Sequence, residues 1–157
     1  MRSSANSAYK VRPYRVRDRD GLISVIDAVC AEGRWMKTDR FEPTPVWEHA
    51  LADPGCPCHL LLVAVDGTRI TGWCRVFPTG DNGEGEIGIG LLAPYRNQGL
   101  GTRMLRRAVK WAKEHHFTRL KLTTRADNTR AIRVFKRCGF VITASTPEGW
   151  VKMTLSL

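Results

Sequence analysis

The sequence predicts a single α/β domain with a mixed, mostly antiparallel twisted sheet of about seven strands, flanked by about four helices. Three observations predict this class: short runs rich in β-branched residues, amphipathic stretches with helical spacing, and turn signals between them. A chain of 157 residues is long enough to bury one core. We expect residues 1–12 to form a frayed tail and residues 13–157 to form the domain, because no repeat or linker divides them.

Signals in the first half of the chain predict one strand, two helices and then a hairpin. Residues 14–17 alternate like a short strand, and residues 22–33 show helical spacing up to a terminal glycine. Thr44 and Pro45 favour the N-cap and first position of a short helix ending at about Ala52. Asp66-Gly67 predicts the turn that joins two β-rich runs. The expected strands, in chain order, are 14–17, 60–65, 70–76, 86–92, 118–124, 140–143 and 150–157.

The second half alternates strands with two helices. A glycine-rich loop follows the strand at 86–92 and opens a helix that ends near His115 and His116. Asn128 can cap the last helix, which Gly139 closes. The strands at 86–92 and 118–124, which the helix after the loop connects, are expected to run parallel. The strands of the first half are expected to be mostly antiparallel.

The net charge of +10 is concentrated in one segment. Residues 96–137 hold 13 Lys and Arg side chains against Glu114 and Asp127, a net charge of +11. Such a field attracts a polyanion, which leaves a nucleic acid, an acidic surface or a phosphate-rich cofactor as possible partners.

The cysteines and the apolar runs indicate the compartment. Five cysteines, an odd number placed mostly within apolar patterns, predict reduced thiols and a cytoplasmic protein. No apolar run approaches the ~20 residues of a membrane span, and the opening residues lack the apolar core of a signal peptide. Cys56, Cys58 and His59 lie together, but no second Cys or His pair stands at ligand spacing, so we expect no metal.

The segment PYRNQGLGTRML, which begins at Pro94, fits one of three phosphate-binding designs. A P-loop requires Lys and then Ser or Thr directly after its last glycine, whereas Thr102 and Arg103 follow Gly101. A dinucleotide fingerprint requires a small residue at the position of Met104 and an acid at the end of the next strand, and neither is present. The third design, R/Q-x-x-G-x-G/A between a strand and a helix, fits every position from Arg96 onward.

This third pattern resembles the acyl-CoA loop of the GNAT superfamily of N-acetyltransferases. NTRAIRVFKRCGF, from Asn128, resembles the second hallmark of that superfamily, and both motifs stand in family order along most of the chain. The resemblance implies a GNAT-like fold splayed at the cofactor-binding strand, acetyl-CoA as co-substrate, and transfer of its acetyl group to a primary amine in a ternary complex. It also makes a homodimer possible.

The resemblance also implies roles for individual residues. The Leu91 N–H would bond the acetyl carbonyl, and the N–H groups from Asn97 to Thr102 would hold the pyrophosphate, helped by the helix N-terminus. Asn128 matches an asparagine that reaches the cofactor, and helix capping is its other role. The implied cofactor-binding residues are Ile89, Gly90, Leu91, Arg96, Asn97, Gln98, Gly99, Leu100, Gly101, Thr102, Asn128 and Phe135.

Catalysis requires a free amine, although an alkyl ammonium has a pKa of ~10.4 in water. Glu86 matches the position of an acid in many relatives and is the expected base or water-organising residue, with Glu84 in reserve. Phe135 stands where relatives usually carry a tyrosine that protonates the leaving thiolate. Either the thiolate, with a thiol pKa of ~8.5, leaves unassisted, or another group, water or Cys138 serves.

The acceptor is expected to contact the loop after the first helix and the hairpin strands. Arg34, Trp35 and Arg75 are the expected acceptor-binding residues, and Phe77 lies on the same hairpin. The amine could belong to a small molecule or a protein, and no nucleic acid or membrane is expected as a partner. Two alternatives stay open: a catalytically weak acyl-CoA sensor, indicated by Phe135, and a basic nucleic-acid-binding module, indicated by the charge of residues 96–137.

Overall fold

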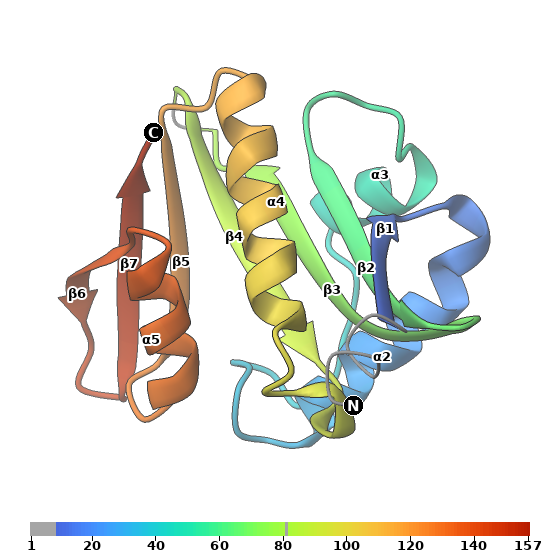
Figure 1. The fold of residues 1–157 in the computed structure, drawn as a ribbon, viewed down its shortest axis with the longest axis horizontal. Helices are drawn as coiled ribbons and strands as arrows, with labels where there is room; N and C mark the ends of the chain where they lie inside the picture. Colours follow the sequence, from blue (N-terminus) through green and yellow to red (C-terminus); the bar gives the residue numbers. More distant parts are fainter. Residues whose placement is uncertain (1–8, 81) are drawn as a thin grey trace.

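The computed structural model, which describes residues 9–80 and 82–157, contains a seven-stranded sheet in the order β1-β2-β3-β4-β5-β7-β6 (Figure 1). The strands are β1 (Tyr9–Pro13), β2 (Leu60–Asp66), β3 (Arg69–Pro78), β4 (Glu84–Leu91), β5 (Arg119–Arg125), β6 (Val141–Ser145) and β7 (Trp150–Ser156). The helices are α2 (Arg19–Ala31), α3 (Pro45–Ala52), α4 (Leu100–Glu114) and α5 (Thr129–Arg137), with 3-10 turns η1 (Val16–Asp18) and η2 (Ala93–Tyr95).

The pairing of the strands confirms the predicted fold class. Every neighbouring pair in the sheet is antiparallel except β4 and β5, which run parallel across the α4 crossover. That parallel pairing covers only three residue pairs, from Glu84 opposite Arg119 to Glu86 opposite Lys121. Beyond them the two strands diverge, as Figure 1 shows, and the sheet is splayed at β4.

Helices cover both faces of the sheet, because alternate side chains of each strand point to opposite faces. Leu62 and Val76 pack with residues of α4 and α5 in one core cluster. Leu61 and Phe77 pack with residues of α2 and α3 in the other cluster. The strand β4 lies between these two layers, so its exposed backbone edge beyond Glu86 opens between helices rather than onto the outer rim of the sheet.

The N-terminal strand is the main departure from the predicted elements. It spans Tyr9–Pro13 rather than 14–17, so residues 9–12 belong to the sheet and not to a tail, and residues 1–8 lie outside the described residues. Two arginines of α4 explain why residues 9–13 form the strand. Arg103 donates to the carbonyl of Tyr9 (3.1 Å), and Arg107 donates to the carbonyl of Val11 (2.8 Å). The expected strand at 14–17 fails because Tyr14 turns inward, where its hydroxyl donates to the Leu51 carbonyl (2.9 Å).

The remaining predicted elements lie within a few residues of the observed ones. Thr44 caps α3 as expected, accepting a hydrogen bond from the Trp47 N–H (3.4 Å). The cysteines differ from expectation at one place, because Cys56 and Cys58 are joined as a disulfide while Cys30, Cys74 and Cys138 are free. None of the described helices combines the length and the apolar character that a membrane crossing requires.

Candidate functional site

The divergence of β4 from β5 leaves one backbone edge of β4 without a strand partner beyond Glu86, and we call the region between these two strand edges the opening. The N–H of Leu92 donates to the carbonyl of Thr71 on β3 (2.8 Å), which fixes the hydrogen-bonding phase of this antiparallel pair. Because the phase alternates along a strand, the backbone groups of Leu91 and Ile89 point away from β3 and toward the opening. The N–H groups of both residues therefore lie on the edge of β4 that β5 leaves unpaired, and their contact with the cofactor stays a prediction.

The loop after β4 is held by Arg96 rather than left free for a ligand. Its Nε donates to the Leu91 carbonyl (2.9 Å), and its two terminal nitrogens pair with Glu32 at the end of α2 (3.0 and 2.7 Å). Trp35 donates to the same carboxylate through its indole N–H (3.0 Å). The pKa of Glu32 is lowered, chiefly by the hydrogen bonds from Arg96. The Arg96 side chain is therefore engaged within the protein, and its backbone N–H also has a partner, the Ala93 carbonyl (3.2 Å).

The N-terminus of α4 offers a set of free donors. Asn97 and Gly99 adopt left-handed conformations (φ 64° and 84°), which turn the chain sharply into the helix. Gly99 occupies the N-cap without a side-chain capping bond, and the first turn carries no acidic residue. The first N–H groups of a helix have no intrahelical acceptor, so those of Leu100 to Thr102 are available to a phosphate. The Gln98 side chain instead donates to the Pro94 carbonyl (2.9 Å) and braces the loop.

Gly88 and Gly90 have a packing reason that their positions in the sequence do not reveal. A Cβ on Gly90 would lie 2.4 Å from the Trp73 ring, and one on Gly88 would lie 2.6 Å from the Arg75 Nε. Both neighbours belong to β3 and lie across β4 on the α2 and α3 side. The missing side chains of the two glycines therefore leave room for Trp73 and Arg75 to lie over β4. This packing accounts for both glycines better than a weak or bulged strand does.

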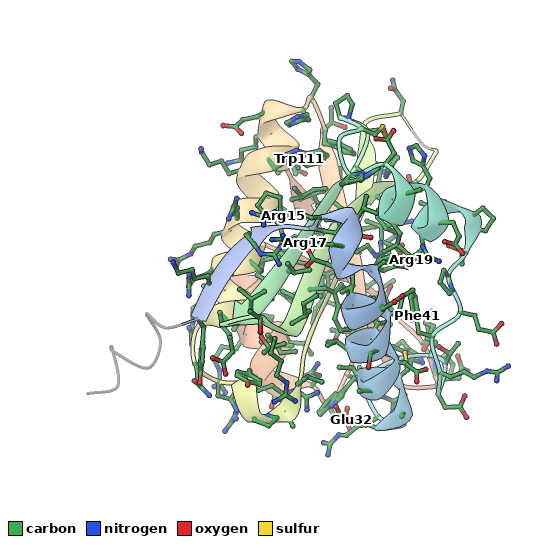
Figure 2. The ribbon with its side chains drawn as sticks, turned by 90° about the vertical axis from the view of Figure 1, so that its right-hand side faces the viewer. Arg15, Arg17, Arg19, Glu32, Phe41 and Trp111 are labelled. Atoms are coloured by element: carbon green, nitrogen blue, oxygen red, sulfur yellow. A yellow bond between two sulfur atoms is a disulfide. The ribbon has the colours of Figure 1, made fainter. Side chains whose placement is uncertain are left out.

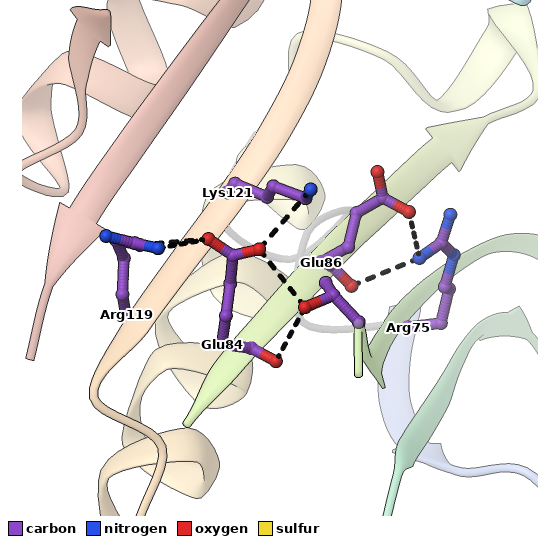
Figure 3. Close-up of polar contacts among 6 residues, drawn as sticks. Arg75, Glu84, Glu86, Arg119 and Lys121 are labelled. Atoms are coloured by element: carbon purple, nitrogen blue, oxygen red, sulfur yellow. Dashed lines mark hydrogen bonds and ion pairs between the residues drawn. The ribbon is translucent and has the colours of Figure 1, made fainter. Parts of the chain in front are cut away.

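Glu84 and Glu86 lie two residues apart on the same face of β4 but in different surroundings (Figure 3). Glu84 is buried and bonds to Arg119 (2.7 and 2.9 Å), to Lys121 (3.3 Å) and to the Thr79 hydroxyl (3.1 Å). Its pKa is lowered, first by the Arg119 hydrogen bond. A carboxylate held in its charged form by two cations is a poor proton acceptor, and this arrangement argues against Glu84 as the base.

Glu86 keeps a large part of its side chain accessible, 41% against 17% for its partner Arg75. The Arg75 guanidinium lies 3.4 Å from the Glu86 carboxylate and donates to the Glu86 carbonyl (3.1 Å). Burial lowers the pKa of Arg75, and the Glu86 charge opposes that shift. The guanidinium stacks over Phe77 (4.6 Å) and lies 6.0 Å from the Trp47 ring centre. Arg75 and Glu86, predicted separately, thus form one charged pair on an aromatic surface.

The second predicted motif lies on α5 and the turn before it. Asn128 stands at the N-cap position, but its side chain does not cap the helix and donates to the Thr124 hydroxyl (3.2 Å). Phe135 is buried against Phe140, with ring centres 6.2 Å apart, in the cluster that also contains α4. Cys138 is a partly buried free thiol at the edge of the same cluster.

The expected acceptor-binding residues divide into two groups. Trp35 contacts Glu32 and lies under Arg34 (4.5 Å) and Arg96 (5.8 Å), whereas Arg75 contacts Glu86 and the aromatic rings of α3 and β3. Figure 2 shows the side of α2, with Glu32 at the end of that helix and Phe41 in the loop that follows.

That loop also reaches the far side of the opening, where the Lys37 ammonium lies 5.4 Å from the centre of the Trp150 ring. Residues 34–43 therefore connect the α2 side of the molecule with the start of β7. Sequence reasoning missed Glu32, Trp47 and Trp150. Each contacts a residue far along the chain, namely Arg96 for Glu32, Arg75 for Trp47 and Lys37 for Trp150, and no local pattern marks it.

Three comparisons place these features among known proteins. Residues 24–140 match the family model described as the acetyltransferase (GNAT) family. A Bacillus subtilis (strain 168) protein provisionally named ribosomal-protein-bS18-alanine N-acetyltransferase is 30% identical over 129 residues, covering 82% of this chain and 78% of that protein. Streptothricin acetyltransferase A of the same organism is 39% identical over 56 residues, only 36% of this chain and 32% of that protein.

Solved structures of low sequence identity share the fold. A Salmonella typhimurium protein provisionally named an acetyltransferase and solved with acetyl-CoA superimposes with a TM-score of 0.82 at 18% identity, covering 96% of this chain and 94% of the other. The ribosomal-protein-alanine N-acetyltransferase of Brucella melitensis superimposes with a TM-score of 0.82 at 16% identity, covering 94% of this chain and 99% of the other. The family match spans both motifs and the splayed strand, and the chain therefore belongs to the GNAT family of acetyltransferases, which use acetyl-CoA as co-substrate.

Proposed function

We propose that the protein transfers the acetyl group of acetyl-CoA to a primary amine by direct attack in a ternary complex. The observation that carries this proposal is the divergence of β4 from β5, which directs the Leu91 N–H into an opening next to the uncapped start of α4. In that opening the pyrophosphate would meet the N–H groups of residues 97–102, and the pantetheine arm would lie along Ile89 and Gly90. The Leu91 N–H would polarise the acetyl carbonyl.

Glu86 is the proposed proton acceptor, acting through water. The amine nitrogen attacks the carbonyl carbon, the carbon–sulfur bond breaks, and the nitrogen proton must leave. Leu91 stands five positions after Glu86 on the strand, a span of ~16 Å, which is too long for direct contact between the Glu86 side chain and the reacting amine. Water would bridge that gap beside the glycines of β4, because their own face is covered by the Trp73 ring and the Arg75 side chain. Arg75 holds the Glu86 carboxylate at the end of that water path that lies farther from Leu91.

The leaving thiolate would depart without a side-chain acid at position 135. Phe135 is packed against Phe140 and carries no exchangeable proton. A thiol pKa of ~8.5 makes the thiolate a tolerable leaving group near neutral pH, so water can protonate it after departure. The same residue supports the second candidate function, a protein that binds acetyl-CoA and turns over poorly.

The acceptor site is proposed to lie between the aromatic surface around Arg75 and the loop 34–43. Trp47 and Phe77 are buried beneath the Arg75 guanidinium and hold it in place, and the partly exposed Glu86 carboxylate attracts a cationic amine. Trp35 and Arg34 stand near the cofactor loop and would contact the part of an acceptor that lies closer to the thioester. Acceptor classes to be tried first follow the relatives: a peptide with N-terminal alanine, and streptothricin.

The test is steady-state release of CoA with those two acceptors, lysine and a polyamine, for the wild type and for Glu86→Gln. The substitution should lower kcat by ~10²-fold or more near neutral pH, because general-base catalysis contributes that much. The deficit should shrink as pH rises toward the pKa of the amine, ~7.7–8.0 for an α-amino group, where the free amine needs no base. Glu114→Gln is the matched control, because Glu114 is an exposed partner of Lys110 on α4 (3.4 Å).

Two results would contradict the proposal in different ways. Unchanged kcat in Glu86→Gln across the pH range would remove Glu86 from the mechanism while leaving acetyl transfer intact. Saturable acetyl-CoA binding by the wild type without turnover of any amine would instead favour the acyl-CoA sensor.

A further inference from the structure

Four metal-binding side chains meet at the connection between α3 and β2. Cys56, Cys58 and His59 lie in that connection, and His49 on α3 joins them in space. We call these four residues the Cys/His cluster. The sequence predicts no metal here, because Cys56, Cys58 and His59 have no second Cys or His pair at ligand spacing, and His49 stands seven residues before Cys56. The fold of α3 supplies the missing donor.

The donor atoms are close enough to share one ion. The Cys58 Sγ lies 3.5 Å from the His49 Nε2 and 3.3 Å from the His59 Nδ1, and one ligand atom from each of the four residues lies within 4.8 Å of the others. A tetrahedral zinc ion with bonds of ~2.3 Å to sulfur and ~2.0–2.1 Å to nitrogen separates its ligands by roughly 3.3–3.8 Å. The two sulfur–nitrogen distances already fall in that range.

The surroundings of the cluster favour a bound ion over a chance encounter of side chains. His59 is only 5% exposed, and its Nδ1 lies beside the Cys58 sulfur (3.3 Å), so this donor is held inside the protein rather than in solvent. The His49 and His59 rings meet edge to face with centres 5.3 Å apart, which turns both imidazoles toward Cys58. His49 belongs to a helix and His59 directly precedes a strand, so two of the four donors are fixed by regular structure.

We propose that the reduced Cys/His cluster binds one Zn²⁺ ion through two thiolates and two imidazoles. The donor set suits zinc, a borderline-soft ion that prefers tetrahedral Cys₂His₂ sites. The site is distinct from the acetyl-transfer site, although His59 lies 6.3 Å from Phe77 between ring centres. Zinc at this position would tie α3 to β2 behind the aromatic surface around Arg75.

Metal binding and the Cys56–Cys58 disulfide exclude each other, because both use the same two sulfurs. A dithiol reductant supplies two electrons and two protons, which cleave the S–S bond into two thiols while the reductant forms its own disulfide. Binding of Zn²⁺ to the two thiols then releases their two protons. The cluster therefore holds zinc under reducing conditions and a disulfide under oxidising ones.

The experiment uses the full chain without a histidine tag, reduced by a dithiol and then freed of excess reductant without exposure to air. Titration with Co²⁺, a spectroscopic substitute for zinc, should give the visible absorption of tetrahedral cobalt with a thiolate charge-transfer band, saturating at one ion per chain. Zn²⁺ should then displace the cobalt. His49→Gln and Cys58→Ser change exposed side chains, so both variants should fold, and each should weaken zinc binding by at least roughly tenfold.

Matched controls change the same residue types elsewhere. Cys138→Ser and His116→Asn should bind cobalt as the wild type does, and asparagine tolerates the left-handed backbone of His116 (φ 66°). Wild type kept oxidised should give no cobalt spectrum. The proposal is overturned if the reduced wild type shows no tetrahedral thiolate spectrum, or if that spectrum persists in Cys58→Ser. Neither result would bear on acetyl transfer, which is assayed separately.

Discussion

Two glutamates on one face of β4 show how neighbouring side chains acquire different chemistry. Glu84 is surrounded by Arg119, Lys121 and Thr79, whereas Glu86 has one cationic partner and remains partly open to solvent. The sequence places both acids on the strand that ends at Leu91 and cannot rank them by their surroundings. Burial and pairing make the first a structural anion and leave the second available for proton transfer.

The anchoring of Glu84 predicts a pH-dependent contribution to stability. Its pKa is lowered in the folded state, so its stabilising effect is complete above the unfolded pKa of ~4.3 and is lost as pH falls through the folded value. Chemical unfolding of the wild type and Glu84→Gln from pH 7 down to pH 2 measures the difference. The stability gap should be constant above about pH 5 and should shrink below ~4.3.

The comparison between the two proteins isolates Glu84 from the other anchored acids. Asp18 also has a lowered pKa, mainly through its hydrogen bonds with Arg12, but it titrates alike in both proteins and cancels from the gap. A stability gap that stays the same down to pH 2 would show that the pKa of Glu84 is not lowered by folding.

At the scale of elements, the glycines of the loop and of β4 serve different purposes. Gly101 has room for a methyl group, since a Cβ there would meet only Leu91 at 3.9 Å, whereas a Cβ on Gly90 would meet Trp73 at 2.4 Å. Folding therefore does not require a glycine at position 101. In the proposed complex the pyrophosphate requires one, because it would approach the backbone closely there. The second is required by packing.

The contrast predicts opposite effects of two alanine substitutions. Gly101→Ala should keep or raise stability by up to ~1 kcal/mol, because alanine favours the helix, yet should weaken acetyl-CoA binding by about tenfold or more. Gly90→Ala should destabilise the fold by ~1–3 kcal/mol through overpacking. Calorimetric titration with acetyl-CoA and urea unfolding measure the two quantities, with Gly55→Ala as a control away from the loop. Unchanged affinity in Gly101→Ala would show that the phosphate does not approach this turn closely.

The elements themselves differ in how far the sequence predicts them. The helix α3 and the β2–β3 hairpin are predicted well because their signals, Thr44-Pro45 and Asp66-Gly67, are local. The strand β1 is misplaced because residues 9–13 and 14–17 alternate alike, and arginines about ninety residues away decide between them. The same reason hides the Glu32–Arg96 pair and the role of His49, since each depends on contacts that only the folded chain creates.

Over the whole molecule, the excess positive charge is partly used within the protein. Arg96 pairs with Glu32, Arg119 and Lys121 pair with Glu84, and Arg103 and Arg107 bond to carbonyls of β1. A further group of basic side chains lines a surface hollow along α5, namely Arg133, Lys136 and Arg137. Part of the positive charge of residues 96–137 therefore stabilises the fold, and the rest contributes to a field that attracts anions.

The central claim is that this charged segment and the opening beside β4 bind acetyl-CoA specifically. Its most direct test is a thermal-shift titration with acetyl-CoA and CoA, at low and high salt, against a DNA oligonucleotide of equal charge. We predict a saturable rise in Tm with acetyl-CoA that persists at high salt, because backbone N–H groups and the pantetheine channel contribute beyond charge. A rise with DNA alone that disappears at high salt, with none for acetyl-CoA, would contradict the account and favour a nucleic-acid-binding module.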